Sequence, residues 1–262
     1  MKPPKSEIRN PKSEIPSLIP GFHGVRETLN QGKVGIREIW IATGKKPGRI
    51  RDILRIAKEH DIPISYKEVS ELSRFLPDVA HQGIVAVAKE FAYADLNHII
   101  EASLQNREAA TLIVADHITD EGNLGALIRT AAFFEVHGLI IPGDRSARIS
   151  ARILKRSSGG YLHLPIAKVV NIGRTLDLLK KKGFWIIGAS GEASMSIYRF
   201  DWGRDLALVL GNEKNGLSRT ARKRCHEVVS IPSSSPVESL NVSVSGGIIL
   251  SEIVRQRGVE RP

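Results

Sequence analysis

The feature that most constrains the fold is a series of five short, unbroken apolar runs in the C-terminal part of the chain. They cover residues 111–115, 138–141, 184–187, 206–210 and 228–231, and helical patterns separate most of them. Strands buried on both faces form continuous apolar runs, whereas strands with one solvated face alternate. The pattern therefore predicts an α/β domain over residues 108–262, in which helices cover both faces of a parallel sheet.

A smaller α/β domain is predicted ahead of it, over residues 18–92. Its expected helices and strands alternate, at residues 25–29, 38–42, 48–59, 62–66 and 83–88. Residues 93–107 are expected to form a linker with some helix. Residues 1–17 repeat the tetrapeptide Lys-Ser-Glu-Ile and are rich in Pro, Lys and Ser. Such a composition predicts a disordered tail, or a start codon assigned too early.

Composition excludes several classes of protein. Hydrophobic residues make up 42% of the 262 residues, which is enough for a packed core. Cys225 is the only cysteine, so no internal disulfide can form and a reducing compartment is expected. No apolar run approaches the roughly 20 residues that cross a bilayer, and the N-terminus lacks the apolar core of a signal peptide. We expect a cytoplasmic protein that binds no membrane.

Basic residues are in excess and gather in groups. The formal net charge is +10, which indicates a polyanionic partner, although a basic surface facing only solvent would have the same charge. One stripe lies on the expected helix at residues 48–59 and consists of Arg51, Arg55 and Lys58. A second group has the spacing of one helical face and consists of Arg145, Arg148, Arg152 and Lys155. A third lies at residues 219–224.

Polar turns follow three of the predicted strands, where α/β proteins place their ligands. The first enters a helix near Asn123, the second spans residues 211–218, and the third is a Ser- and Pro-rich stretch at residues 231–245. Each has an ordinary explanation: Asn123 as a helix cap with Arg129 as a surface charge, Ser218 as a cap, and a flexible loop. Neither G-x-G-x-x-G nor G-K-[ST] occurs, which argues against a nucleotide-dependent oxidoreductase.

Taken together, the three turns resemble the signature motifs of SpoU-type (SPOUT) 2′-O-ribose RNA methyltransferases. The matching stretches are Asn-Leu-Gly-Ala-x-x-Arg-Thr from Asn123, Leu-Gly-x-Glu-x-x-Gly-Leu from Leu210, and Ile-Pro-x₆-Ser-Leu-Asn-Val-Ser from Ile231. Residues 21–27 and 81–86 resemble the family's substrate-binding domain, which is similar to ribosomal protein L30e. The branch that methylates a guanosine ribose in bacterial 23S ribosomal RNA is the most similar, and the resemblance covers residues 19–258.

The resemblance implies a C-terminal parallel sheet with a deep trefoil knot, preceded by an L30e-like domain. It implies S-adenosylmethionine as cofactor, ribosomal RNA as partner, no metal, and a homodimer whose active site is completed across the interface. The catalytic candidates are Arg129, Asn123, Glu213, Ser239 and Asn241. The cofactor candidates are Leu210, Gly211, Asn212, Gly216, Ile231, Pro232, Leu240 and Ser243. The RNA-binding candidates are Arg51, Arg55, Lys58, Arg145, Arg148 and Arg152.

The chemistry leaves some roles open. A guanidinium has no acceptor and a pKa above about 12, so we expect Arg129 to clamp the target phosphate rather than act as a base. Glu213, Ser239 and Asn241 are candidates for orienting the hydroxyl or relaying its proton. The family often has Pro in place of Glu121, and alanines where Gly246 and Gly247 begin the final helix. Two other functions stay open: methylation of transfer RNA, and binding of ribosomal RNA without catalysis.

Overall fold

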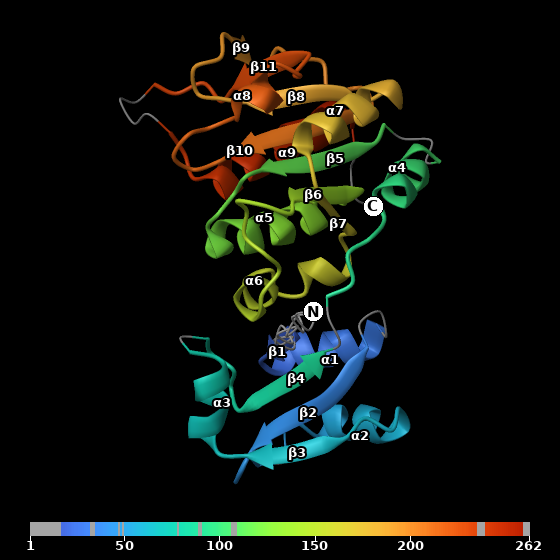
Figure 1. The fold of residues 1–262 in the computed structure, drawn as a ribbon, viewed down its shortest axis with the longest axis vertical. Coiled ribbons are helices and arrows are strands. Elements are labelled where there is room, and N and C mark those ends of the chain that lie inside the picture. The colour runs from blue at the N-terminus through green and yellow to red at the C-terminus, as the bar shows by residue number, and fades with distance from the viewer. Residues whose placement is uncertain are drawn as a thin grey trace, which may run out of the picture.

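The computed structural model of the protein describes residues 17–31, 35–46, 48, 50–77, 79–88, 91–105, 109–234 and 239–258. Two sheets organise the chain, with the smaller N-terminal one at the bottom of Figure 1 and the larger C-terminal one at the top. The expected disordered tail lies outside the described residues except for Ser17, which is the first residue of a strand rather than part of a tail.

The N-terminal sheet has the strand order β1-β4-β2-β3. The strands β2 (Ile36–Ala42), β3 (Ile64–Lys67) and β4 (Ile84–Ala88) confirm the three expected ones to within a few residues. The short strand β1 (Ser17–Pro20) was not expected and pairs antiparallel with β4. Two helices, α1 (Phe22–Gln31) and α2 (Arg51–Glu59), pack against one face of this sheet, and α3 (Val69–Phe75) packs against the other.

The C-terminal sheet has seven strands, all parallel, in the order β7-β6-β5-β10-β8-β11-β9. The five apolar runs correspond to β5 (Thr111–Asp116), β6 (Gly138–Pro142), β8 (Trp185–Ala189), β10 (Leu206–Gly211) and β11 (Glu227–Ser230). The edge strands β7 (Ile166–Val169) and β9 (Met195–Ser196) were not predicted.

Helices cover both faces of this sheet, as the unbroken apolar runs predict. One face packs against α5 (Glu121–Phe133), α6 (Ala151–Arg156) and α9 (Val242–Gln256). The other packs against α4 (Leu96–Leu104), α7 (Ile172–Lys181) and α8 (Arg219–Arg222). The strands alternate accordingly, so that Ile113 and Leu208 face α5 while Leu112 and Val209 face α7. No described helix is long and apolar enough to cross a membrane.

Helix α9 lies close against α5 and β10. It begins at Val242, so Gly246 lies inside the helix and does not begin it. A Cβ added at Gly246 would lie 2.9 Å from Leu127 Cδ1 and 3.0 Å from Leu210 Cδ1. The missing side chain therefore lets the helix approach the core more closely than an alanine would without some adjustment of these leucines.

The end of α9 is tied to the base of the sheet by Arg257. Its guanidinium donates four hydrogen bonds, of 2.6–3.0 Å, to the carbonyl oxygens of Ala109, Trp202 and Arg204 and to Thr111 Oγ1. These acceptors come from the segment that enters β5 and from the segment before β10. One side chain thus fixes the C-terminal helix to two of the central strands.

Replacing Arg257 by Ala should lower the free energy of unfolding by about 2–4 kcal/mol, because three carbonyl groups lose a charged donor. The Arg55→Ala variant is the control, since Arg55 is exposed and only pairs with Glu59 within α2. It should change the free energy by less than about 0.5 kcal/mol. Denaturant-induced unfolding of the three proteins measures both values. Equal stability of the two variants would contradict the role given to Arg257.

Candidate active site

The candidate site lies at the carboxyl ends of the central parallel strands. The turns after β5, β10, β8 and β11 all leave the same edge of the sheet, because neighbouring parallel strands end on the same side. Three of these turns carry the predicted motifs. The fourth, at residues 190–194 after β8, was not predicted, although its small residues and its glycine after an apolar run were a usable signal.

The first turn is organised by Asp120 rather than by Asn123. Asp120 Oδ1 accepts a hydrogen bond from the Asn123 backbone N–H at 2.7 Å and caps α5, so the expected cap at Asn123 is wrong. Asn123 stands inside the first turn of the helix, and its side chain is available for contacts with other loops. This difference gives Asn123 a role in the site that a capping residue would not have.

Three of the predicted catalytic residues form one hydrogen-bonded chain. Asn241 Nδ2 donates to Asn123 Oδ1 at 2.6 Å, and Asn123 Nδ2 donates to Glu213 Oε1 at 2.9 Å. Asn241 Oδ1 in turn accepts from the backbone N–H and the hydroxyl of Ser243, at 2.9 and 2.7 Å. An ionised carboxylate only accepts, so Glu213 determines which way both amide groups face. Segments up to 118 residues apart therefore meet here.

The turn after β10 is closed by its own backbone and by Asn212. Asn212 and Gly216 exchange two backbone hydrogen bonds of 2.9 Å. Asn212 Nδ2 donates to the His117 carbonyl at 2.7 Å, which links this turn to the one after β5. A Cβ on Gly211 would lie 2.2 Å from the Gly216 carbonyl carbon, so only glycine permits this closure. Three predicted cofactor residues, Gly211, Asn212 and Gly216, thus shape the turn itself.

A buried carboxylate that sequence reasoning missed supports both turns. Asp116, the last residue of β5, is fully buried. It accepts hydrogen bonds from His117 Nδ1 at 2.7 Å and from the Ser218 backbone N–H at 2.6 Å. Ser218 caps α8, as expected, by accepting from the Ala221 N–H. An acidic residue that ends an apolar strand is the signal that could have identified Asp116, since such a group needs partners when buried.

Arg129 does not join the Glu213–Asn123–Asn241 chain. It follows Asn123 by six residues on α5, a rotation of about 240° at 100° per residue, so the two side chains leave different sides of the helix. Arg129 is exposed, and its Nη1 donates to Ser158 Oγ at 3.4 Å. Ser158, in the turn after α6, was not among the predicted residues.

The remaining candidates are placed as follows. Leu210 is buried beneath the turn after β10, while Ile231 and Ser243 are half-buried and Pro232 and Ser239 are exposed. The Leu240 side chain is 49% exposed, which is high for a large apolar residue beside polar loops. The turns after β10 and β11 thus offer backbone groups and apolar side chains at one edge of the sheet.

Of the three basic groups, the one on α2 lies as expected and the one that begins at Arg145 does not. Arg51, Arg55 and Lys58 are exposed on α2, as predicted. Arg145 and Arg148 lie in the loop before α6, so the prediction that they share a helical face with Arg152 is wrong. Arg145 has a φ of +51°, which a helix does not allow, and α6 begins only after the cap at Ser150. All three are exposed.

Known proteins resemble the chain over both of its sheets. The model of the SpoU rRNA Methylase family matches residues 110–251, and the model described as RNA 2'-O ribose methyltransferase substrate binding matches residues 18–94. The 23S rRNA (guanosine-2'-O-)-methyltransferase RlmB of Pectobacterium atrosepticum is 37% identical over 92% of this chain and 98% of its own. The protein of the same name from Neisseria meningitidis is 39% identical over 90% of this chain and 94% of its own.

Solved structures agree with the sequence matches. The SpoU methyltransferase AviRb from Streptomyces viridochromogenes superposes with a TM-score of 0.78 at 26% identity, covering 92% of this chain and 90% of that one. The same enzyme in complex with the cofactor AdoMet superposes with a TM-score of 0.77. The family matches, the relatives and the fold agree, and the chain belongs to the SpoU family of RNA 2′-O-ribose methyltransferases.

Proposed function

We propose that the protein transfers the methyl group of S-adenosylmethionine to the 2′-hydroxyl of a guanosine in 23S ribosomal RNA. The observation that carries the proposal is the Glu213–Asn123–Asn241 chain, which joins the three motif turns at the edge of the sheet. Relatives named for this reaction cover nearly the whole chain, including the domain at residues 18–92 that we propose reads the RNA. Such a substrate places the enzyme in the cytoplasm.

The residues at the strand ends fit S-adenosylmethionine. An adenosine group buries its ring against apolar side chains and forms hydrogen bonds with backbone groups at its edges. Leu240 and Ile231 offer the apolar surface, while the turn of Gly211, Asn212 and Gly216 offers backbone. Leu210, Pro232 and Ser243 complete the proposed pocket. When bound there, the cofactor supplies a methyl group on a positively charged sulfur, so the proposed reaction requires no metal ion.

The protein must orient the ribose hydroxyl and take up its proton. Glu213 is exposed, and its carboxylate can accept more hydrogen bonds than the one from Asn123. Asn123 and Asn241 hold that carboxylate at the turn. The ribose hydroxyl can therefore donate its hydrogen bond to an acceptor that is fixed in place. Ser239, two residues before Asn241, is a second candidate for orienting the hydroxyl. Arg129 then grips the neighbouring phosphate through two parallel N–H groups.

Because Arg129 leaves α5 on a different side from Asn123, we propose that a homodimer completes the site, with the partner's Arg129 facing these turns. A groove with exposed apolar side chains is available for a second copy. Tyr198 and Val244 are 57% and 49% exposed, and they line a groove of about 380 Å³ along α9. Phe133, at the end of α5, is 61% exposed. Surfaces of this kind usually form contacts between proteins.

We also propose that the end of the chain is threaded into the family's deep trefoil knot. Its support is the contact of α9 and Asn241 with α5 and Asn123, 118 residues earlier in the chain. Knots are rare exceptions among folds. A knot in this position would hold the turns after β10 and β11 against each other without any further contacts from the substrate.

The activity can be tested with unmodified 23S ribosomal RNA and transfer RNA, both transcribed in vitro. Methyl groups from labelled S-adenosylmethionine should enter the ribosomal RNA alone, at one guanosine 2′-oxygen located by nuclease mapping. The Arg129→Ala variant should lose at least about a hundredfold in turnover yet keep its cofactor affinity within a few-fold. Incorporation into transfer RNA alone would contradict the proposed substrate, and no incorporation into either would contradict the proposed activity.

The Glu213–Asn123–Asn241 chain predicts a pH-dependent loss of stability in the Asn123→Asp variant. This change places a second carboxylate against Glu213, so the folded-state pKa of one of them rises above its unfolded value. A raised carboxyl pKa lowers the free energy of unfolding as the pH rises from the unfolded-state pKa to the folded-state pKa. Well below about pH 4 the carboxyl is protonated in both states, and stability is unaffected. The melting temperature of Asn123→Asp should therefore fall further below that of the parent at pH 8 than at pH 5. Asn123→Ala should show a deficit that does not vary with pH. Identical pH profiles for the two variants would refute the contact.

The shared active site predicts recovery of activity in mixed dimers. Arg129→Ala and Glu213→Ala dimers should each be inactive, because every site lacks one residue. After unfolding and refolding an equal mixture, half of the dimers carry one intact site, so about a quarter of parental activity should return. If Arg129 acts within its own subunit, mixing will restore nothing. A monomeric mass in solution would rule out the arrangement directly.

A further inference from the structure

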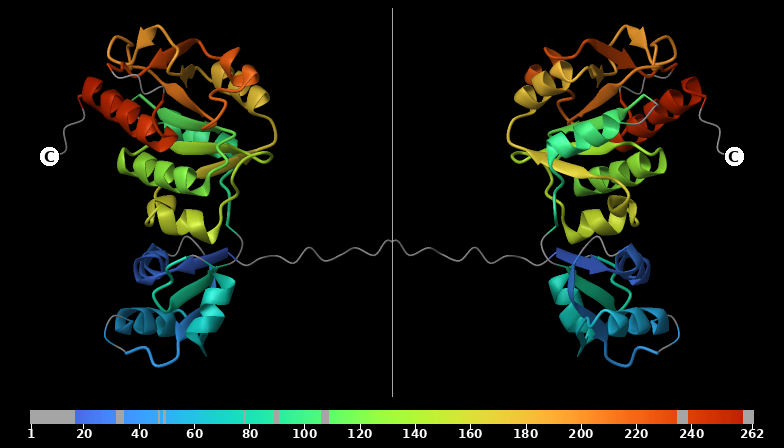
Figure 2. Two further views of the ribbon diagram at one scale, coloured as in Figure 1. Left: turned by 90° about the vertical axis from the view of Figure 1, so that its left-hand side faces the viewer. Right: turned by 90° about the vertical axis from the view of Figure 1, so that its right-hand side faces the viewer.

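A short turn separates the substrate-binding domain from the helix that carries Arg129. It consists of residues 157–163, follows α6, and contains the single helical turn η1 (Gly160–Leu162). Figure 2 shows this region between α1 of the small domain and α5 of the large one. The buried apolar cluster on the α1 side of the small sheet is continuous through this region with the cluster around α5.

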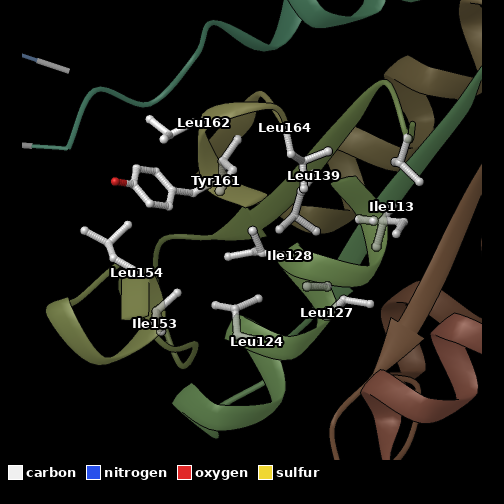
Figure 3. Close-up of a cluster of buried hydrophobic side chains, with 14 of the residues drawn as sticks. Ile113, Leu124, Leu127, Ile128, Leu139, Ile153, Leu154, Tyr161, Leu162 and Leu164 are labelled. Atoms are coloured by element: carbon white, nitrogen blue, oxygen red, sulfur yellow. The ribbon is translucent and has the colours of Figure 1, made fainter. Parts of the chain in front are cut away.

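A buried hydrogen bond joins the turn to α1. Tyr161 Oη lies 2.6 Å from Thr28 Oγ1, and the Thr28 hydroxyl also donates to the Gly24 carbonyl at 2.7 Å. A carbonyl only accepts, so the one hydrogen of Thr28 is committed to Gly24, and Tyr161 is the donor to Thr28. Burial raises the pKa of Tyr161 to about 12, so the phenol keeps its proton near neutral pH. Figure 3 shows the ring beside Leu154 and Leu162 with its hydroxyl directed away from Ile128.

A second contact on the same side joins the turn to Glu27 of α1. His163 Nε2 lies 3.0 Å from Glu27 Oε1, which comes from the same helix as Thr28. Gly159 has a φ of +88°, and a Cβ at this position would lie 1.9 Å from Glu27 Oε2. The backbone of the turn therefore lies directly against the end of the Glu27 side chain.

The opposite side of the turn lies against α5 at Arg129. A Cβ on Gly160 would lie 3.0 Å from Arg129 Cα and 3.2 Å from the Ile128 carbonyl oxygen. Ser158, with a left-handed φ of +48°, accepts the hydrogen bond from Arg129 Nη1. Two adjacent glycines, Gly159 and Gly160, thus place one stretch of backbone against α1 on one side and against α5 on the other.

We propose that the turn of residues 157–163 is a positioning element, through which the seating of the substrate-binding domain sets the orientation of the Arg129 guanidinium. The proposal rests on the role given to Arg129 in the proposed function. The buried Tyr161–Thr28 hydrogen bond ties the turn to α1, so a displacement of α1 is carried through Tyr161 to Gly160 and Ser158, which lie against Arg129. Tyr161, Thr28 and Ser158 then act on turnover through Arg129, without touching the RNA or the cofactor themselves.

Kinetics of three conservative variants test this coupling in the full-length protein. Tyr161→Phe removes only the donated hydrogen bond, Thr28→Val removes its acceptor, and Ser158→Ala removes the partner of Arg129. Each should lower kcat by about three- to tenfold, the size of one lost hydrogen bond, with KM for RNA within about twofold of the parent. Thr28→Ser keeps the hydroxyl and should restore the parental kcat. Tyr93→Phe, which alters another partly buried tyrosine outside the turn, should leave kcat unchanged.

The decisive measurement is the double variant Tyr161→Phe with Ser158→Ala. If both residues act through Arg129, kcat of the double variant should equal kcat of the less active single variant. If the two losses in kcat multiply in the double variant, the coupling is overturned. It is also overturned if the single variants raise KM and leave kcat unchanged, because the turn would then only shape the RNA surface. Unchanged kinetics in all three variants would overturn it too. Arg129→Ala, measured beside them, reports separately on the proposed function: if it stays fully active, the role of Arg129 fails whatever the turn does.

Discussion

Burial of both faces of the seven-stranded parallel sheet is the constraint on which the rest of the structure depends. Residues that alternate along β5 and β10 enter two different cores, Ile113 and Leu208 on the α5 side and Leu112 and Val209 on the α7 side. Because both faces of these strands enter apolar cores, polar side chains can stand only at the strand ends. Asp116 is the clearest case, since it is fully buried at the last position of β5 and supports the turns on either side of it. The site is therefore confined to one edge of the sheet by the packing of the core.

Helix α5 connects that edge to the small domain. One side of it carries Asn123 and lies near α9, while another carries Arg129 and lies against the turn of residues 157–163. A rigid helix keeps these two sides in fixed relation, because its residues advance by about 1.5 Å and 100° each. The proposed catalytic arginine and the proposed carboxylate are thus held apart within one subunit. This separation is why the proposed site needs a second subunit, and why the turn of residues 157–163 lies beside Arg129 rather than beside Glu213.

Sequence patterns predicted the larger elements well and the smaller ones poorly. The run at residues 206–210 corresponds to β10 almost residue for residue, because a strand buried on both faces must be apolar throughout. The missed strands β1, β7 and β9 all lie at the edge of a sheet and pair with a single neighbour each. The spacing of Arg145, Arg148 and Arg152 also fits a helix. However, α6 begins only at Ala151, after its N-cap Ser150, so Arg145 and Arg148 lie outside it. A spacing of three and four is compatible with a helix but does not form one.

The sequence by itself determined the class of fold, the parallel sheet, the three motif turns and the resemblance to a methyltransferase family, because periodicity and motif spacing are local properties of the chain. Only the tertiary structure decided that Asp120 caps α5 and leaves Asn123 to bridge Glu213 and Asn241. It alone placed Arg129 beside Ser158, and Tyr161 beside Thr28, which is 133 residues away. These contacts join segments that are distant in the chain, and their geometry depends on how the two sheets and their helices pack, which no local pattern encodes.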